Sequence, residues 1–231
     1  MSTNLAQQLR EGTTKSHSMA ENVSFVKSFL GGVVDKKSYR RLVGNLFFIY
    51  SAIEEEIENN KDHISIRSIY FPQLYRKESL IQDLKYYYGK DWNRNVQPSV
   101  ATQVYVDRIH YIGNCNPELL IAHAYTRYMG DLSGGQILKK IAQSAMNLSD
   151  NLGTSFYDFQ DIKDEKVFKN SYRDSLNNIP LTNSQIDQII LEANIAFNLN
   201  MKVFQELNSN FIKIMLMLLL SSINNFSKKF S

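Results

Sequence analysis

The 231-residue sequence lacks the features that define several large classes of protein. Its single cysteine, Cys115, excludes an intramolecular disulfide and a thiolate metal site, and it fits a reducing compartment. The net charge of +3 is too small to indicate nucleic-acid binding. No Gly-x-Gly-x-x-Gly motif follows a candidate strand, so nothing indicates a bound dinucleotide. Any metal must therefore be held by histidine or carboxylate, or arrive inside a cofactor.

Long hydrophobic segments are also absent. Residues 1–20 contain no apolar stretch flanked by positive charge and are not typical of a transit segment, so the protein is expected to stay where it is made. Residues 211–220 are strongly apolar, but a membrane-spanning helix needs about 20 such residues. The sequence therefore predicts no transmembrane anchor. A terminal helix packed on the body is favoured over a membrane-surface contact by residues 211–230.

Helical periodicity dominates the chain, and no stretch alternates with period two for long enough to demand a β-sheet. A first helix that reaches residue 20 is expected to be capped by Ser2-Thr3. Residues 39–57 predict a long amphipathic helix, and a helix over residues 99–112 is expected to end at the glycine that follows. Residues 182–185, Thr-Asn-Ser-Gln, predict a capping box that begins the last long helix. The pattern indicates one irregular all-α domain.

Three glycines interrupt the helical pattern of residues 125–140. Each costs up to about 1 kcal/mol of helix stability relative to alanine. Gly130 and Gly134 share a face because they are four residues apart, and a face without side chains lets a flat ligand lie against the backbone. The pair Gly134-Gly135 is also typical of a helix kink. The alternative is that the glycines only permit close helix packing or divide the helix in two.

An acidic residue lies between these glycines. Asp131 belongs to a segment that is otherwise apolar enough to be buried, and Arg127 is one turn away. A buried carboxylate needs a partner, and a guanidinium or an ordered water would complete a polar network in a dry site. The glycines with this acid therefore favour a ligand site over simple helix packing.

The four histidines are not equivalent. We expect His63 to be a solvated surface residue, and His110 to be half exposed. His123 is expected to be a hydrogen-bonded interior histidine. His17 shares a predicted helix face with Leu9, and its spacing alone leaves open whether it is a metal ligand.

The run over residues 125–136, Tyr-Thr-Arg-Tyr-Met-Gly-Asp-Leu-Ser-Gly-Gly-Gln, resembles the distal-helix signature of haem oxygenases. The similarity is close to the cyanobacterial and plastid branch and extends from Asn4 to about Lys213. It implies an all-α domain over residues 1–213, in which haem is sandwiched between a proximal helix and a glycine-kinked distal helix. Residues 214–231 are then a C-terminal tail, apolar and then polar.

The activity that the resemblance implies is the oxidative cleavage of haem b at the α-meso carbon. The products are biliverdin IXα, carbon monoxide and ferrous iron, so haem is both substrate and cofactor. O2 and electrons from reduced ferredoxin drive the reaction in that branch, where biliverdin feeds bilin pigment synthesis. Ferredoxin is acidic, and the cations expected to contact it are Arg10, Lys15, Lys139 and Lys140.

The resemblance also implies roles for residues on the iron side and at the pocket mouth. His17 matches the axial iron ligand, and Glu21 lies four residues on, where it can orient the imidazole directly or through water. The haem propionates would be bound by Arg10, Lys169 and Arg173. Mammalian relatives carry lysine where this sequence has Arg10, which keeps the charge. From the sequence pattern alone, each of these cations could equally well be a solvated charge on the surface of a helix.

On the opposite side, the resemblance implies that O2 binds where Gly130 and Gly134 leave no side chain in the way. Asp131 would order distal water in a network with Tyr50 and Arg127, and the same network would also serve to bridge helices. Phe197 is equally well explained as core packing. The other residues that the resemblance places at the haem are Tyr125, Thr126 and Phe197.

Three other functions fit the sequence less well. A haem carrier or sensor on the same fold would bind the metal and leave the ring intact, but it would gain from a second axial ligand in place of the glycines. A helical enzyme of the thiaminase-like class needs a cysteine or carboxylate site, and Cys115 lies in a predicted loop that fits catalysis poorly. A purely structural bundle gives no reason for the glycines. The absence of a transit segment and the abundance of Asn, Ile and Lys fit the plastid stroma, for a plastid-encoded protein, or a cyanobacterial cytoplasm.

Overall fold

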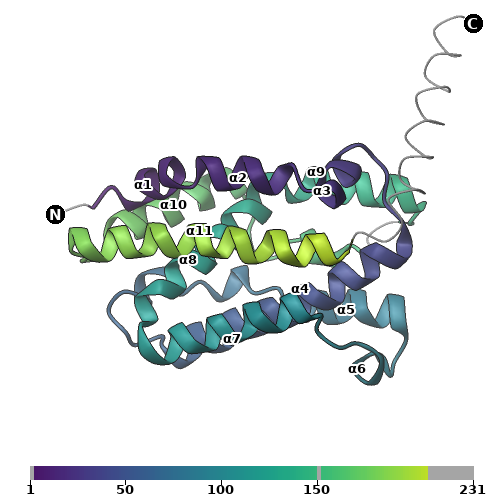
Figure 1. Ribbon diagram of the computed structural model, residues 1–231, viewed down its shortest axis with the longest axis horizontal. Coiled ribbons are helices and arrows are strands. Elements are labelled where there is room, and N and C mark those ends of the chain that lie inside the picture. The colour runs from purple at the N-terminus through teal and green to yellow at the C-terminus, as the bar shows by residue number, and fades with distance from the viewer. Residues whose placement is uncertain (1–2, 150–151, 208–231) are drawn as a thin grey trace, which may run out of the picture.

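The computed structural model describes residues 3–149 and 152–207, and within these ranges every regular element is a helix (Figure 1). None of the helices described is long and apolar enough to cross a membrane. The apolar residues 211–220 and the predicted tail lie outside the described residues. The α-helices are α1 (Leu5–Gly12), α2 (Thr14–Glu21), α3 (Ser24–Leu30), α4 (Lys36–Asn59), α5 (Lys77–Tyr88), α6 (Trp92–Asn95), α7 (Val100–Cys115), α8 (Leu120–Ala124), α9 (Gly130–Met146), α10 (Glu165–Asn177) and α11 (Asn183–Glu206). Shorter turns are η1 (Arg67–Ile69), η2 (Pro72–Leu74), η3 (Pro117–Leu119), η4 (Tyr125–Met129) and η5 (Ser155–Tyr157).

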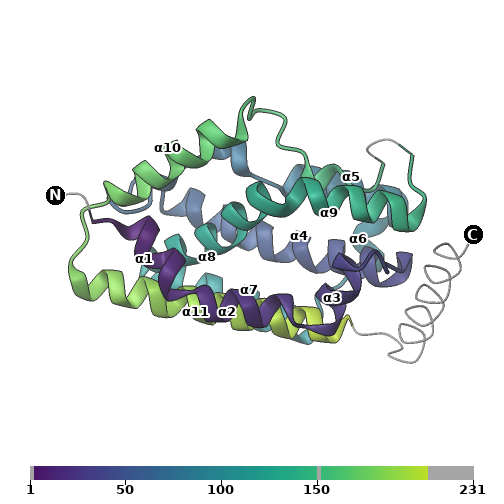
Figure 2. The ribbon, with the colours of Figure 1, turned by 90° about the horizontal axis from the view of Figure 1, so that it is seen from above.

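Helices α4 and α11 have 24 residues each and run along the length of the molecule (Figure 1). Helix α4 packs against α5 and α7, and α11 packs against α1, α2, α7 and α8. Seen from above, α9 and α10 lie along one side of the molecule and α1, α2 and α11 along the other (Figure 2). The helix that carries the glycines and the helix that carries His17 therefore lie on opposite sides.

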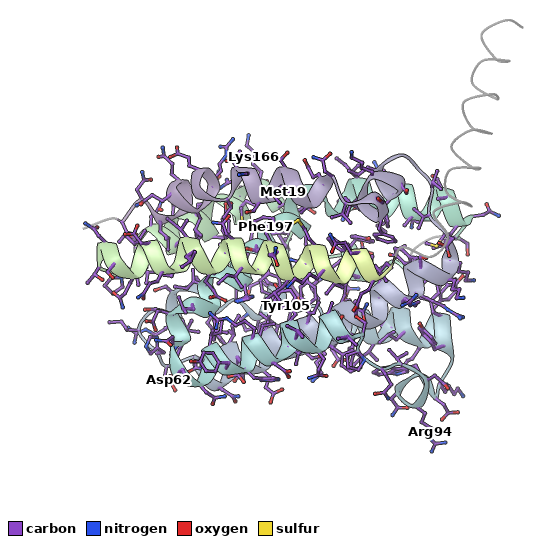
Figure 3. The ribbon with its side chains drawn as sticks, viewed as in Figure 1. Met19, Asp62, Arg94, Tyr105, Lys166 and Phe197 are labelled. Atoms are coloured by element: carbon purple, nitrogen blue, oxygen red, sulfur yellow. The ribbon has the colours of Figure 1, made fainter. Side chains whose placement is uncertain are left out.

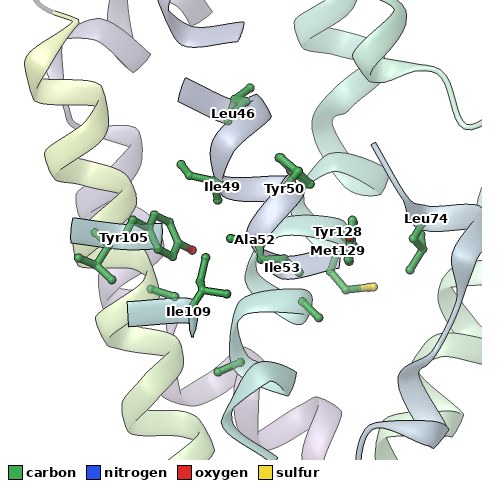
Figure 4. Packing of buried hydrophobic residues seen from close by; sticks show 14 of the residues in the cluster. Leu46, Ile49, Tyr50, Ala52, Ile53, Leu74, Tyr105, Ile109, Tyr128 and Met129 are labelled. Carbon is green, nitrogen blue, oxygen red and sulfur yellow. The ribbon is translucent and has the colours of Figure 1, made fainter. Parts of the chain in front are cut away.

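The core fills the layers between these helices with aromatic and aliphatic side chains. Tyr105, a residue of α7, is fully buried at the contact between α7 and α11 (Figure 3). Tyr50 and Ile53 of α4 meet Tyr128 of η4, the turn that leads into the glycine-bearing helix α9, called the distal helix below. All three residues are at most 2% exposed (Figure 4). Burial of a large apolar side chain contributes about 1.5–3 kcal/mol. The distal helix is thus fixed from behind by a close-packed core.

Three helix starts are fixed by local sequence, and the capping box among them confirms the prediction. The Asp35 carboxylate accepts a hydrogen bond from the Ser38 backbone N–H at 2.9 Å, at the start of α4. At the start of α11 the capping box is complete: the Gln185 N–H donates to the Thr182 hydroxyl at 3.3 Å, and the Thr182 N–H donates to the Gln185 side chain at 3.0 Å. Ser99 caps α7 in the same way.

Two helix boundaries differ from the prediction. The first helical segment is divided at Thr13 into α1 and α2, and Thr3 caps neither of them: its hydroxyl donates to the Asn177 carbonyl at 3.1 Å, which joins the N-terminus to the end of α10. Helix α7 continues through Gly113 to its last residue, Cys115. A Cβ on Gly113 would lie 2.2 Å from a carboxylate oxygen of Glu56, so this glycine marks a close helix contact and not a helix end.

The capping box predicts the effect of one exposed substitution. Thr182→Ala removes the side-chain acceptor at the start of α11 and should lower the free energy of unfolding by about 1 kcal/mol, measured by urea denaturation. Ser184→Ala, two residues further along and also exposed, is the control and should change it little. Equal losses in the two variants would contradict the role given to the cap.

Candidate functional site

The glycine-bearing segment forms one continuous helical path made of α8, the π-helical turn η4 and α9. The departure from α-helical hydrogen bonding falls at Tyr125–Met129, ahead of the first glycine. The predicted kink pair, Gly134-Gly135, lies within α9, where Gly135 faces the ring of Tyr157. Single π turns inside α-helices are frequent at functional sites.

Gly130 and Gly134 present a bare surface. A Cβ added to either would meet no atom within 4 Å. Both glycines line a cavity of about 740 Å³, the central cavity, which α1 and α2 bound on the opposite wall. The cavity also brings together seven residues that the sequence predicted as a site, namely Arg10, His17, Glu21, Tyr125, Thr126, Arg173 and Phe197.

His17 and Glu21 form the wall contributed by α2. Their side chains are 60% and 57% exposed, and His17 Nδ1 lies 3.7 Å from Glu21 Oε1. That distance is longer than a hydrogen bond, so the carboxylate is near the imidazole without holding it directly. The ring of Phe197 packs edge-on against the imidazole, with ring centres 5.8 Å apart. This contact accounts for Phe197 as a cavity residue and not only as core packing.

A buried polar network lies behind the glycines. The Tyr50 hydroxyl donates to Asp131 Oδ2 and accepts a hydrogen bond from Arg127 Nε at 2.9 Å. The same guanidinium donates to Asn200 Oδ1 at 2.9 Å. The network therefore joins α4, the distal helix and α11. Asn200 was not predicted, and its only signal in the sequence is an amide within the apolar stripe of the last helix.

Burial and charge set the protonation of this network. Burial raises the pKa of Asp131, although Arg127 and the Tyr50 hydroxyl both oppose the shift. Burial acts to lower the pKa of Arg127, but Tyr50 and Asp131 outweigh it and the pKa is raised. Burial also raises the pKa of Tyr50, so its hydroxyl keeps its proton. Asp131 thus carries a carboxyl group that can gain or lose a proton in a dry setting.

Two of the three predicted propionate cations reach the cavity. Arg10 and Arg173 line it together with Tyr125, whose pKa is raised by burial, so that its hydroxyl is a donor. Lys169 instead donates to the Leu132 carbonyl on α9, at 3.3 Å. The structure therefore places Lys169 against the distal helix.

The model of the family described as "Heme oxygenase" matches residues 3–206. The chain belongs to the haem oxygenase family. A heme oxygenase from Porphyra purpurea is 66% identical over 229 residues, which cover 99% of this chain and 97% of that protein. One from Pyropia yezoensis is 66% identical and covers 98% of this chain and 95% of the relative. The crystal structure of heme oxygenase-1 from the cyanobacterium Synechocystis, in complex with heme, superposes with a TM-score of 0.90 at 60% identity, covering 95% of this chain and 99% of that one. The predicted family and the all-α fold are confirmed.

The remaining histidines of this haem oxygenase lie away from the central cavity. His123 is fully buried and lies 2.9 Å from Glu192 Oε1 and 3.3 Å from the Tyr105 hydroxyl, as expected of an interior histidine. Burial raises the pKa of Glu192, but His123 and Arg108 outweigh it and lower the pKa to about 2. His110 is half exposed, as predicted, and pairs with a glutamate of α4 at 2.6 Å.

One predicted surface cation is buried. Lys139 is 9% exposed, and its Nζ donates to both carboxylate oxygens of Asp158, at 2.6 and 2.8 Å. The expectation that Lys139 is free to contact an acidic partner protein is therefore wrong. Lys140, Lys15 and Arg10 are exposed. The sequence could not distinguish the two neighbouring lysines, because the carboxylate that pairs with Lys139 comes from the loop after α9.

The free space at the two glycines predicts an uncommon effect on stability. In the ligand-free protein, Gly130→Ala and Gly134→Ala should each raise the free energy of unfolding by about 0.5–1 kcal/mol, because alanine is the better helix former and its Cβ meets nothing. Gly113→Ala is the matched control in α7 and should lower stability, because its Cβ would contact Glu56. Urea denaturation measures all three. Loss of stability in the first two variants would contradict the bare surface described here.

Proposed function

We propose that the chain cleaves haem b at the α-meso carbon to biliverdin IXα, carbon monoxide and ferrous iron, with the haem held in the central cavity between α2 and α9. The observation that carries the proposal is the bare surface at Gly130 and Gly134, which faces a wall that presents the imidazole of His17. A flat ligand with a central metal fits two such walls. When bound, haem supplies an iron that binds and activates O2 and a ring that is itself oxidised.

His17 is the residue that would hold the iron. Its imidazole is exposed to the cavity, and Phe197 restricts the orientation of the ring from one side. A histidine ligand donates less electron density than a thiolate, which suits a reaction in which oxygen is delivered to the ring. Glu21, at 3.7 Å from Nδ1, can fix the imidazole through an ordered water or a small shift.

Asp131 would act on the other side through water. Residues next to it, Gly130 and Ser133, line the cavity, whereas the carboxylate lies behind them in the network with Tyr50 and Arg127. Asp131 Oδ1 is 3.9 Å from the guanidinium and would be the oxygen that orients a water toward the cavity. That water would donate its hydrogen bond into the space that the glycines leave open. The same network also bridges three helices, so its structural and chemical roles are combined.

The mouth of the cavity would bind the haem carboxylates. The Arg10 and Arg173 guanidinium groups and the Tyr125 hydroxyl are donors that match carboxylate geometry. Thr126 also lines the cavity, although its hydroxyl oxygen is buried and has no hydrogen-bond partner among the described residues. Lys169 would have to leave the Leu132 carbonyl to join them. These residues would orient the bound haem, and that orientation would determine which meso carbon is oxidised.

Electrons would come from reduced ferredoxin, and the exposed cations Lys15, Lys140 and Arg10 would attract its acidic surface. The product would feed bilin pigment synthesis in a plastid stroma or a cyanobacterial cytoplasm. The relatives from red algae and cyanobacteria support this setting. A haem carrier or sensor is the alternative, and the bare helix surface at Gly130 and Gly134 disfavours it because neither glycine can supply a second axial ligand.

Removal of the imidazole tests the proposed function. His17→Ala should weaken haem binding, shift the Soret band and abolish biliverdin formation, and added imidazole should restore part of each. His63→Ala, a histidine outside the cavity, should behave as the unsubstituted protein. Haem titration and product spectra are the measurements. A His17→Ala variant that binds and cleaves haem normally would refute the assignment.

Charge reversal tests the electron donor. The double variant Lys15→Glu with Lys140→Glu should slow ferredoxin-driven turnover by about tenfold at low salt, because electrostatic steering of association is lost. Turnover with ascorbate should not change. Arg94→Glu reverses a charge on α6, on the opposite side of the molecule from α2 (Figure 3), and should change neither rate. Equal slowing with ferredoxin and ascorbate would show that the lysines do not serve donor docking.

A further inference from the structure

A second cavity, of about 580 Å³, adjoins the central cavity and is called the outer cavity. It lies between α1 and α10, which border one end of the molecule (Figure 2). Ala6, Arg10 and Arg173 line both cavities. The two guanidinium groups proposed to bind the haem carboxylates therefore stand at the boundary between the cavities.

The outer cavity differs from the central cavity in the chemistry of its walls. Most of its side chains are carboxamides, namely those of Asn4, Gln7, Asn170 and Asn177. Asp174 adds one carboxylate. No aromatic ring and no histidine lines it within the described part of the chain, whereas the central cavity has both. Carboxamides donate and accept hydrogen bonds, so the outer cavity suits a polar, metal-free molecule with carbonyl and carboxylate groups.

Contacts between α1 and α10 fix the shape of the outer cavity. The Asn177 carbonyl accepts the backbone N–H of Thr3 at 2.8 Å, and Asn177 Oδ1 accepts that of Ala6 at 3.0 Å. Arg173 Nη1 donates to Asn170 Oδ1 at 2.9 Å, which holds this guanidinium at the boundary. The side-chain NH2 groups of Asn170 and Asn177 donate to none of the described residues. Both groups are therefore available to a ligand.

Biliverdin differs from haem in ways that match this second set of walls. It contains no iron, so it makes no bond to the imidazole of His17. It is an open chain that ends in two carbonyl groups, which haem lacks, and it keeps both carboxylates. The product thus loses its hold in the central cavity while it keeps the groups that bind Arg10 and Arg173.

We propose that the outer cavity is a binding site for the open-chain tetrapyrrole product as it leaves the central cavity. The proposal rests on the proposed function, because haem cleavage supplies this product. Arg10 and Arg173 keep the carboxylates while the chain moves outward, since their side chains line both cavities. The NH2 groups of Asn170 and Asn177 donate to its terminal carbonyl groups.

Asp174 limits how long the product stays. This residue lines the outer cavity and not the central one, and no ion pair joins its carboxylate to Arg10 or Arg173. Its negative charge repels the carboxylates of the product. The outer cavity therefore binds the product with limited affinity and releases it to solvent.

Two isosteric substitutions on α10 test the outer cavity with opposite expected signs. Asp174→Asn removes the like charge, so the Kd for biliverdin added to the haem-free protein should fall by about threefold at low salt. Asn170→Asp keeps the acceptor for Arg173 but adds a carboxylate, so this Kd should rise by about threefold. The double variant restores the net charge of the cavity and should return the Kd to that of the unsubstituted protein. The visible absorption of biliverdin measures each value.

Haem binding and ring opening are the internal controls. Asn170 and Asp174 do not line the central cavity, so the haem Kd should change less than the biliverdin Kd in every variant. Single turnover with haemin and ascorbate should keep its rate, whereas release of biliverdin should slow in Asp174→Asn, because affinity changes act mainly through dissociation. Asp107→Asn, an exposed acid of α7 that lines neither cavity, should match the unsubstituted protein.

Two results would overturn the product site while leaving the proposed function intact. One is a biliverdin Kd that stays constant in both single variants. The other is a biliverdin Kd that changes by the same factor as the haem Kd, which would show a general effect of charge at the mouth of the central cavity. Failure of the unsubstituted protein to form biliverdin would overturn the proposed function, and the product site with it.

Discussion

The hydrogen bond from Tyr50 to Asp131 is the interaction on which the site depends, because it joins the central helix α4 to the distal helix at the first glycine. Arg127 and Asn200 extend it to α11, so the backbone at Gly130 and Gly134 is held in place from behind by buried polar contacts. This support lets the front of the helix do without side chains. The helix contains glycines that lower its own stability, but the hydrogen-bonded network and the surrounding core hold its backbone in position.

The chemistry of the site follows from the difference between the two faces of the distal helix. The face toward the cavity carries Gly130 and Gly134, and the opposite face carries the buried polar network. Gly130 and Gly134 present no side chain to the cavity, whereas the facing wall presents the imidazole of His17. Arg10 and Arg173 bring positive charge to the cavity, Glu21 brings a carboxylate beside His17, and the remaining charges of the site lie in the network behind the glycines. Haem bound between the walls would thus meet a fixed ligand on one side and open space with access to a proton on the other.

Features fixed by local sequence were predictable, and features fixed by contacts between distant segments were not. The capping box at Thr182, the helical periods and the glycine face follow from spacing alone. The burial of Lys139 required knowing that Asp158 folds back onto α9, and the division of the first helix at Thr13 accompanies packing against α11. Glu54, in the acidic end of α4, is buried beside the segment around Arg76, whose backbone N–H donates to it, and spacing within the helix does not show that contact. Site residues that the family motif carries were found; Asn200, with no motif, was missed.

One measurement tests the central claim most directly. The purified protein is mixed with one equivalent of haemin, supplied with ferredoxin, its reductase and NADPH under air, and followed by visible absorption and carbon monoxide detection. The account predicts loss of the Soret band, appearance of biliverdin and release of about one equivalent of carbon monoxide. A stable haem complex that keeps its ring intact would contradict the account and indicate a carrier or sensor.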